Sequence, residues 1–138
     1  MKSRKVGIVG AGAVGATAAY SLALMGTCNE IVLFDIADGV AKGKAIDMAQ
    51  ATYYAPSPTK ITAAENASDI KDCEIVVVTA GVPRKGDMTR ADLLMINAKI
   101  TKQVVENIKE NSPDAIIICV SNPLDIMTYV TKQITGWD

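Results

Sequence analysis

The sequence contains no histidine, only three cysteines and no hydrophobic run as long as a membrane span. Because histidine is absent, the chain has no imidazole that could serve as a general acid or base. An odd number of cysteines without metal-like spacing indicates reduced packing residues and not a disulfide framework; they are Cys28, Cys73 and Cys119. No apolar run approaches the roughly 20 residues that a transmembrane helix needs.

Neither sign of charge is in excess, since 14 Lys and Arg residues face 15 Asp and Glu residues for a net charge of −1. Nucleic acids and anionic membranes bind basic faces, so we expect neither as a partner. The charged N-terminal residues lead into an apolar strand and a glycine loop, and not into the apolar region of a signal peptide. These absences together predict a cytoplasmic protein.

Hydrophobic residues make up 49% of the 138 residues, which is enough for one domain with a substantial core. Short continuous apolar runs predict buried strands at 5–9, 30–35, 60–62, 74–79 and 115–120. Helical patterns predict helices at 13–25, at 38–54, from the Thr89 capping box to Asn111, and after Pro123. The alternation predicts an α/β fold of the Rossmann type, with a doubly wound parallel sheet of about five strands and helices on both faces.

Two further expectations follow from this pattern. A complete dinucleotide-binding domain has six strands, so residues 1–138 are expected to form one such domain whose sixth strand lies beyond Asp138. In the long helix after Thr89, the helical spacing predicts one buried face, formed by Leu93, Asn97, Ile100, Val104 and Ile108.

A glycine-rich segment with the spacing G-x-G-x-x-G joins the first strand to the first helix. Its residues are Gly10, Ala11, Gly12, Ala13, Val14 and Gly15. The first glycine permits a tight turn, the second lets the backbone approach a pyrophosphate, and the third lets the helix pack closely on the strand. The N–H groups and the positive dipole end of the helix then face the phosphates. The alternative is a glycine turn with a purely steric cause, but the strand, helix and downstream acid favour dinucleotide binding.

Asp35 ends the second predicted strand, about 20 residues after the glycine segment, where the acid that binds a ribose belongs. Its carboxylate can accept both hydroxyls of the adenosine ribose. A 2′-phosphate here would meet a like charge at a cost of several kcal/mol. The sequence therefore favours NAD over NADP, with an ordinary strand-end aspartate in a turn as the alternative.

Two more strand ends reach the same carboxyl edge of the predicted sheet, where ligands of such sheets bind. Thr79, Ala80 and Gly81 follow the fourth strand, and their small side chains would let a cofactor lie against the backbone. Val120 and Asn122 end the fifth strand, where the asparagine amide can orient a carbonyl or hydroxyl. An asparagine that only stabilises a turn is the alternative at that position.

A cation-rich loop follows Gly81. Its Arg84 lies six positions before Arg90, and the two guanidinium groups could bind an anionic substrate together. Arg90 has the firmer base because it lies on the first turn of the next helix. A solvated surface loop is the alternative.

Together these segments resemble the lactate/malate dehydrogenase family, in particular the malate dehydrogenases that are lactate-dehydrogenase-like in sequence. The resemblance extends over essentially the whole chain. It is carried by residues 10–15, 33–36, 43–48 and 79–85, and most specifically by 88–94 with Asn97 and by 120–127.

The resemblance implies roles for individual residues. Arg84 would bind the distal carboxylate of malate or oxaloacetate, where lactate dehydrogenases place a glutamine, and Arg90 would polarise the substrate carbonyl. Asn97 would contact the cofactor, and Val120 and Asn122 would line the nicotinamide. Asn122 would also contact substrate, and a cis peptide bond to the following proline would aim its side chain. The resemblance further implies NAD as the cofactor, no metal, and a homo-dimer or homo-tetramer.

The chain departs from the family pattern in two ways. Gly86-Asp87 stands where the family usually has Pro-Gly, and Asp87 could pair with Arg84 in an open loop. The family's catalytic histidine, its aspartate partner and a third substrate arginine belong to a second half that lies outside these residues. We therefore expect no catalytic residue in this chain.

Two other functions remain open. One is oxidation of lactate or another 2-hydroxy acid, but Arg84 facing a methyl group would be costly. The other is a stand-alone NAD-binding module without catalysis, which would have no use for the two loop arginines.

Overall fold

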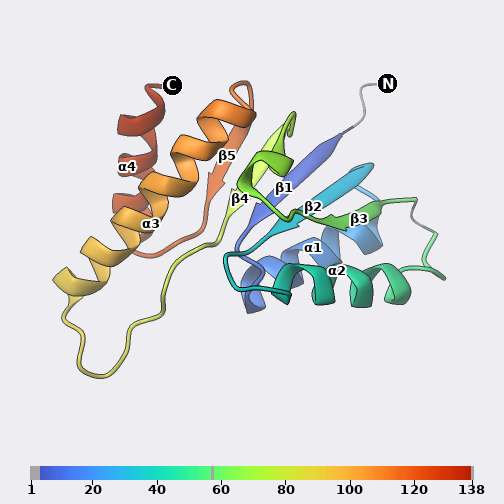
Figure 1. Cartoon of the computed structure of the whole chain (residues 1–138), viewed down its shortest axis with the longest axis horizontal. Helices are drawn as coiled ribbons and strands as arrows, with labels where there is room; N and C mark the ends of the chain where they lie inside the picture. The colour runs from blue at the N-terminus through green and yellow to red at the C-terminus, as the bar shows by residue number, and fades with distance from the viewer. Residues whose placement is uncertain (1–3, 57, 138) are drawn as a thin grey trace.

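The computed structural model describes residues 4–56 and 58–137 as one parallel sheet with helices on both faces (Figure 1). Five strands lie in the order β3-β2-β1-β4-β5. Their bounds are Lys5–Val9 for β1, Glu30–Phe34 for β2, Lys60–Ala63 for β3, Ile75–Val78 for β4 and Ile116–Cys119 for β5. The chain begins at the centre, builds outward to β3, and then returns past β1 to add β4 and β5. This is the doubly wound topology that the sequence predicts.

The described residues also form four α-helices and one short 3-10 helix, and all but the last helix lie between strands. They are α1 (Ala13–Met25), α2 (Val40–Ala51), the 3-10 helix η1 (Ala67–Ile70), α3 (Arg90–Asn111) and α4 (Leu124–Thr135). The bounds of α1 and α3 match the predicted helices, whereas α2 is shorter than predicted at both ends. The sequence did not predict η1, because four residues are too few to show a helical period.

Alternate residues of each strand face opposite layers of the core. Ile8, Ile31 and Leu33 are fully buried on the face that α1 and α2 cover. Val76 and Val78 are buried on the opposite face, with η1 and the C-terminal part of α3. Because all strands run parallel, their carboxyl ends, and the loops that carry the predicted site, meet at one edge of the sheet.

The predicted buried face of α3 is only partly correct. The buried residues form a different line along the helix, namely Asn97, Thr101, Val105 and Ile108. The cause is α4, against which Thr101 packs with its hydroxyl 3.2 Å from the sulfur of Met127. Since α3 contacts both the sheet and α4, its buried stripe faces both partners, and a single amphipathic face does not describe it.

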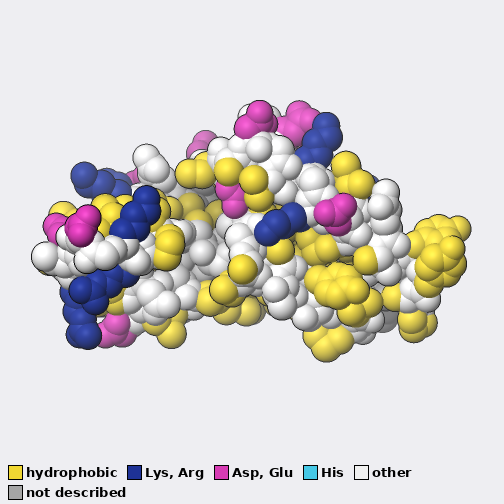
Figure 2. Space-filling model, turned by 90° about the horizontal axis from the view of Figure 1, so that it is seen from below, with side chains coloured by type: hydrophobic (Ala, Val, Ile, Leu, Met, Phe, Trp, Pro, Cys, Tyr) yellow, Lys and Arg dark blue, Asp and Glu magenta, His cyan; other side chains and the backbone are white. Residues whose placement is uncertain are grey.

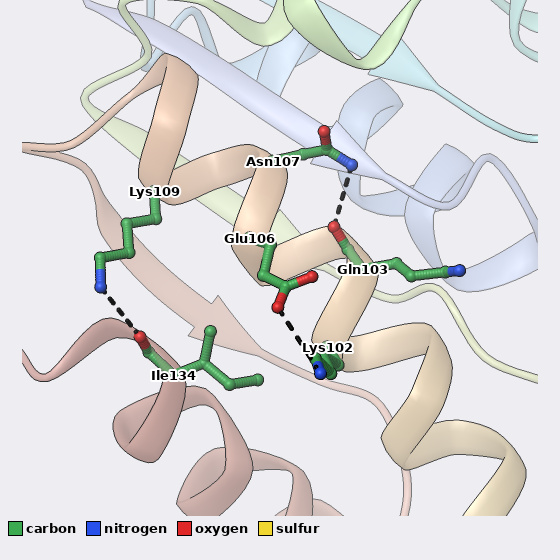
Figure 3. Close-up of polar contacts among 6 residues, drawn as sticks. All are labelled: Lys102, Gln103, Glu106, Asn107, Lys109 and Ile134. Carbon is green, nitrogen blue, oxygen red and sulfur yellow. Dashed lines mark hydrogen bonds and ion pairs between the residues drawn. The ribbon is translucent and has the colours of Figure 1, made fainter.

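Figure 3 shows the C-terminal half of α3, where one of the polar contacts drawn joins it to α4. The Nζ of Lys109 donates a hydrogen bond of 3.1 Å to the carbonyl oxygen of Ile134. Lys102 and Glu106 form an exposed ion pair on the same helix, with 3.8 Å between nitrogen and oxygen. An exposed pair of this kind adds little stability, so the packing of α3 against α4 rests mainly on its buried side chains.

β5 is an edge strand in the part of the chain that the structure describes, since β4 is its strand neighbour and nothing pairs on its other side. Its side chains are accordingly exposed: Ile116 is 65% and Ile118 is 46% accessible to solvent. The sixth strand predicted from the sequence stays a prediction.

The three cysteines are free thiols, of which Cys28 and Cys73 are buried and Cys119 is partly exposed. Burial raises the pKa of Cys28 and of Cys73 above the ordinary value of a thiol. Both side chains pack as small apolar groups in the core. None of the helices described is long and apolar enough to cross a membrane.

Candidate functional site

The glycine segment forms a tight turn between β1 and α1. Gly10 has a φ of 102°, a conformation that side chains disfavour. A methyl group on Gly10 would also lie 2.6 Å from Oγ1 of Thr79, and one on Gly15 would collide with the carbonyl oxygen of Gly10. The protein's own packing therefore requires glycine at both positions.

Gly12 is different, because no heavy atom lies within 4 Å of a methyl group placed on it. Its φ of −67° is a value that any residue can adopt. It is the N-cap of α1, and α1 has neither a side-chain cap nor an acidic residue in its first turn. The first N–H groups of the helix and its positive dipole end thus face open space, which suits a pyrophosphate.

Asp35 already has partners without a ligand. Its Oδ2 accepts a hydrogen bond of 2.7 Å from the Ala11 N–H, and its Oδ1 accepts one of 2.9 Å from the Ala37 N–H. The carboxylate therefore holds the glycine segment against the end of β2. Each oxygen keeps a further lone pair, so the turn role and the predicted ribose role are compatible.

A cleft of about 480 Å³ lies at the carboxyl edge of the sheet. Its lining includes several predicted site residues, namely Gly10, Gly12, Asp35, Thr79, Ala80 and Gly81. A larger hollow of about 680 Å³ shares Asp35 but runs along α2 and β3, away from the glycine turn. The smaller cleft is the candidate site because the glycine turn and the end of β4 meet there.

Residues on α3 form the opposite wall of this cleft. Ile100, Gln103 and Val104 line it, although the sequence analysis did not name them as site residues. Their helical spacing from Asn97 was the signal that could have found them, because residues three or four apart share a helix face. Val120 and Asn122 do not line the cleft and lie beyond it at the end of β5.

Hydroxyl groups join neighbouring strand ends. The Oγ1 of Thr79 donates to the Gly10 carbonyl at 2.9 Å, and the Oγ of Ser121 donates to the Ala80 carbonyl at 2.7 Å. These bonds link β1 to β4 and β4 to β5. Ser121, which the sequence analysis passed over, therefore helps to fix the geometry of the site.

Asn97 is buried and bonds only to backbone. Its Oδ1 accepts a hydrogen bond of 2.9 Å from the Val82 N–H. Its Nδ2 donates to the carbonyl oxygens of Val82 at 3.3 Å and of Asn122 at 2.7 Å. The Asn122–Pro123 peptide bond is cis, which confirms the prediction.

Residues 83–88, here called the arginine loop, lead from Val82 to the N-cap of α3. Arg84 is exposed, and its Nε donates to the Met88 carbonyl at 3.1 Å. Within residues 4–56 and 58–137 Arg84 and Asp87 form no ion pair, so the pairing suggested from the sequence is absent. Figure 2 shows charged side chains gathered at the end of the molecule where this loop lies.

Arg90 is the first residue of α3 and is also exposed. The Thr89 hydroxyl and N–H donate to Oδ2 of Asp92 at 2.6 and 2.9 Å, and the Asp92 N–H donates back to the hydroxyl at 3.1 Å. These bonds lower the pKa of the Asp92 carboxyl below its ordinary value. No hydrogen bond in the described part of the chain joins Arg84 or Arg90 to Asn122.

The described residues include no cluster of side chains that could hold a metal ion. The site therefore consists of an open helix N-terminus, a strand-end carboxylate, an apolar cleft wall and two exposed arginines. Such a set of groups suits a dinucleotide with an anionic substrate beside it.

Comparison with known proteins identifies relatives of this chain. Residues 4–138 match the family described as lactate/malate dehydrogenase, NAD binding domain. A malate dehydrogenase of Sulfurimonas denitrificans is 56% identical over 99% of this chain and 43% of its own length. The malate dehydrogenase of Archaeoglobus fulgidus in complex with NADH superposes with a TM-score of 0.92 at 43% identity, over 97% of this chain and 46% of that one.

A minor L-lactate dehydrogenase of Enterococcus mundtii superposes with a TM-score of 0.94 at 37% identity, over 100% of this chain and 44% of its own. The chain thus spans less than half the length of these relatives. The matched family region, residues 4–138, includes the glycine turn, Asp35 and the start of α1. The chain therefore belongs to the lactate/malate dehydrogenase family and comprises its NAD-binding domain.

Proposed function

We propose that this domain serves a malate dehydrogenase, in which a hydride passes between NAD and the C2 carbon of malate or oxaloacetate. The observation that carries the proposal is Arg84, in an exposed loop next to the cofactor cleft, because a second substrate carboxylate needs a cationic partner. The relatives named malate dehydrogenase support the same substrate class. Such an activity would belong to the tricarboxylic acid cycle.

The residues of this chain fit the cofactor. The N–H groups at the start of α1, beside Gly12, would bind the pyrophosphate, and Asp35 would accept the hydroxyls of the adenosine ribose. When bound, NAD supplies the hydride acceptor. Arg84 would bind the distal carboxylate, Arg90 would polarise the substrate carbonyl, and Asn122 would orient it.

The family resemblance assigns delivery of a proton to the substrate oxygen to a histidine, and these 138 residues include none. General acid catalysis contributes roughly 10²–10⁴-fold. We therefore propose that the 138-residue chain binds NAD without turning over oxaloacetate, and that the catalytic histidine and aspartate lie in a second domain.

The test is calorimetry with NAD and NADP, beside an absorbance assay with oxaloacetate and NADH on the purified chain. We expect binding of NAD at least tenfold tighter than of NADP, about 1.4 kcal/mol, and no turnover. Equal affinities for NAD and NADP would show that Asp35 does not bind the ribose. Turnover within tenfold of an intact relative would show that the catalytic acid lies in this chain.

Lactate is the second candidate substrate, favoured by the close superposition on a lactate dehydrogenase. The two are separated by Arg84→Gln in a protein that includes a substrate domain. If malate is the substrate, oxaloacetate reduction should fall on the order of 10³-fold and the relative rate with pyruvate should rise. An unchanged ratio of the two specificity constants would exclude Arg84 from the substrate site.

We also propose a cytoplasmic location and a homo-dimer or homo-tetramer for the whole protein. The free cysteines support a reducing compartment. Hydrophobic side chains exposed over α1, α2 and the following turn, which include Tyr20, Ile46, Tyr53 and Tyr54, support self-association (Figure 2). Sedimentation of the whole protein would test the assembly.

A further inference from the structure

We propose that Asn97 is a positioning residue that ties the root of the arginine loop to the turn that carries Asn122. The resemblance alone makes Asn97 a cofactor contact, whereas the structure shows its side chain engaged by the backbone on both sides. Its significance rests on the proposed function, because the loop and the turn carry the residues assigned there to the substrate.

The hydrogen bonds of Asn97 leave little capacity for a ligand. Both hydrogens of Nδ2 are donated, to the carbonyl oxygens of Val82 and Asn122, and Oδ1 accepts the Val82 N–H. One acceptor lone pair remains, on a side chain that is 2% exposed. The orientation of the amide is determined by its neighbours, because the Val82 N–H needs an acceptor and the two carbonyl oxygens need donors.

Gly81 makes this close approach possible. A methyl group on Gly81 would lie 3.2 Å from Oδ1 and 3.4 Å from Cγ of Asn97, so the side chain would have to move. The sequence predicted that the small size of Gly81 admits the cofactor. The structure adds a second role, because Gly81 leaves room for the Asn97 amide to bond both Val82 and Asn122.

The tether defines where the loop can move. Asn97 holds Val82 at one end, and the Thr89–Asp92 hydrogen bonds hold the other end, so both anchors lie on α3. The six residues between these anchors are free of either tether. Arg84 lies within them and donates to the Met88 carbonyl, whereas Arg90 follows the second anchor as the first residue of α3.

The experiment is amide hydrogen exchange, followed by NMR on the full 138-residue chain. In Asn97→Ala we expect the Val82 amide to exchange at least tenfold faster, and the Asn122 carbonyl ¹³C resonance to shift. The Thr79 amide, which bonds to Val9, should exchange within twofold of wild type and report that the fold is intact. Asn111→Ala is the matched control, because that amide bonds only within α3.

Two further variants keep the test decisive if Asn97→Ala fails to fold. Asn97→Asp retains an acceptor but loses both donors, so Val82 should stay protected within threefold while the Asn122 carbonyl resonance shifts. Gly81→Ala should accelerate Val82 exchange at least threefold, and Gly43→Ala, where the added methyl meets nothing within 4 Å, should not.

The proposal is overturned if Asn97→Ala leaves Val82 exchange unchanged, and a tenfold loss of NAD affinity beside that result would make Asn97 a direct ligand instead. It is equally overturned if Asn97→Asp behaves as wild type at both probes. The exchange measurement needs no ligand. Failure of NAD to bind the wild-type chain would contradict the proposed function and leave the tether unaffected.

Discussion

Helices α1 and α3 both follow strands at the carboxyl edge of the sheet, but their N-termini are capped differently. α1 starts at Gly12 with no side-chain cap and no acid in its first turn. α3 starts at Thr89 with a reciprocal capping box that includes Asp92. A cap contributes about 1 kcal/mol to a helix. α1 thus forgoes this stabilisation and keeps its first N–H groups for a ligand, whereas the N-terminus of α3 anchors a loop.

The largest expected effect comes from Gly15→Ala, which tests whether the glycine turn is required by the protein's own packing. The added methyl would collide with the Gly10 carbonyl oxygen, which is backbone and cannot easily move. We expect the free energy of unfolding in urea to fall by about 3 kcal/mol. Gly43→Ala on α2 is the control, and equal stability of the two variants would contradict the steric argument.

Gly12→Asp would make the start of α1 resemble that of α3. An aspartate there can cap the helix and interact with its dipole, so the free energy of unfolding should rise by about 0.5 kcal/mol. The same carboxylate would repel the pyrophosphate, and NAD affinity measured by calorimetry should fall at least 100-fold, about 2.7 kcal/mol. Gly43→Asp adds the same charge away from the cleft and should change neither quantity by as much. Unchanged NAD affinity would show that the N-terminus of α1 does not bind the pyrophosphate.

Thr89→Ala is the reverse change at α3. It removes the hydroxyl that accepts the Asp92 N–H and donates to the Asp92 carboxylate. We expect the free energy of unfolding to fall by about 1 kcal/mol and NAD affinity to stay within twofold. A tenfold loss of NAD affinity would mean that the two helix starts are not independent.

The smallest expected effect is on pH dependence. The hydrogen bonds from Thr89 lower the pKa of Asp92 in the folded protein, so their stabilisation is present above the ordinary pKa of an aspartate. It is lost as the pH falls through the lowered folded-state pKa. NMR titration of the Asp92 carboxyl should show this low pKa in wild type and an increase toward the ordinary value in Thr89→Ala. The same Asp92 pKa in both proteins would show that the Thr89 hydroxyl does not cause the shift.

The features that were predicted correctly from the sequence are those that a local pattern of residues encodes. The glycine spacing, the strand-end position of Asp35 and the Thr89 capping box all depend on residues close together in the chain, and each is found where it was expected. The parallel sheet then brings these segments to one edge, because parallel strands present their carboxyl ends on the same side.

Sequence reasoning was less informative where contacts join distant segments. The bonds from Asn97 to Asn122 and from Ser121 to Ala80 cross 25 and 41 positions and leave no periodic signal. The buried stripe of α3 was displaced for the same reason, because α4 packs against it. The roles of Arg84 and Arg90 toward a substrate stay predictions, since they depend on a partner molecule.

The edge of β5, which is unpaired among the described residues, has a consequence for handling the 138-residue chain. A parallel edge strand presents unpaired N–H and C=O groups, and Ile116 and Ile118 add exposed hydrophobic surface beside them. Two copies of the chain can pair along such edges, and the paired product can recruit further copies. Turbidity should therefore increase with concentration, and a lysine at position 116 or 118 should act as a solubilising gatekeeper without altering the cofactor cleft on the other side of β4.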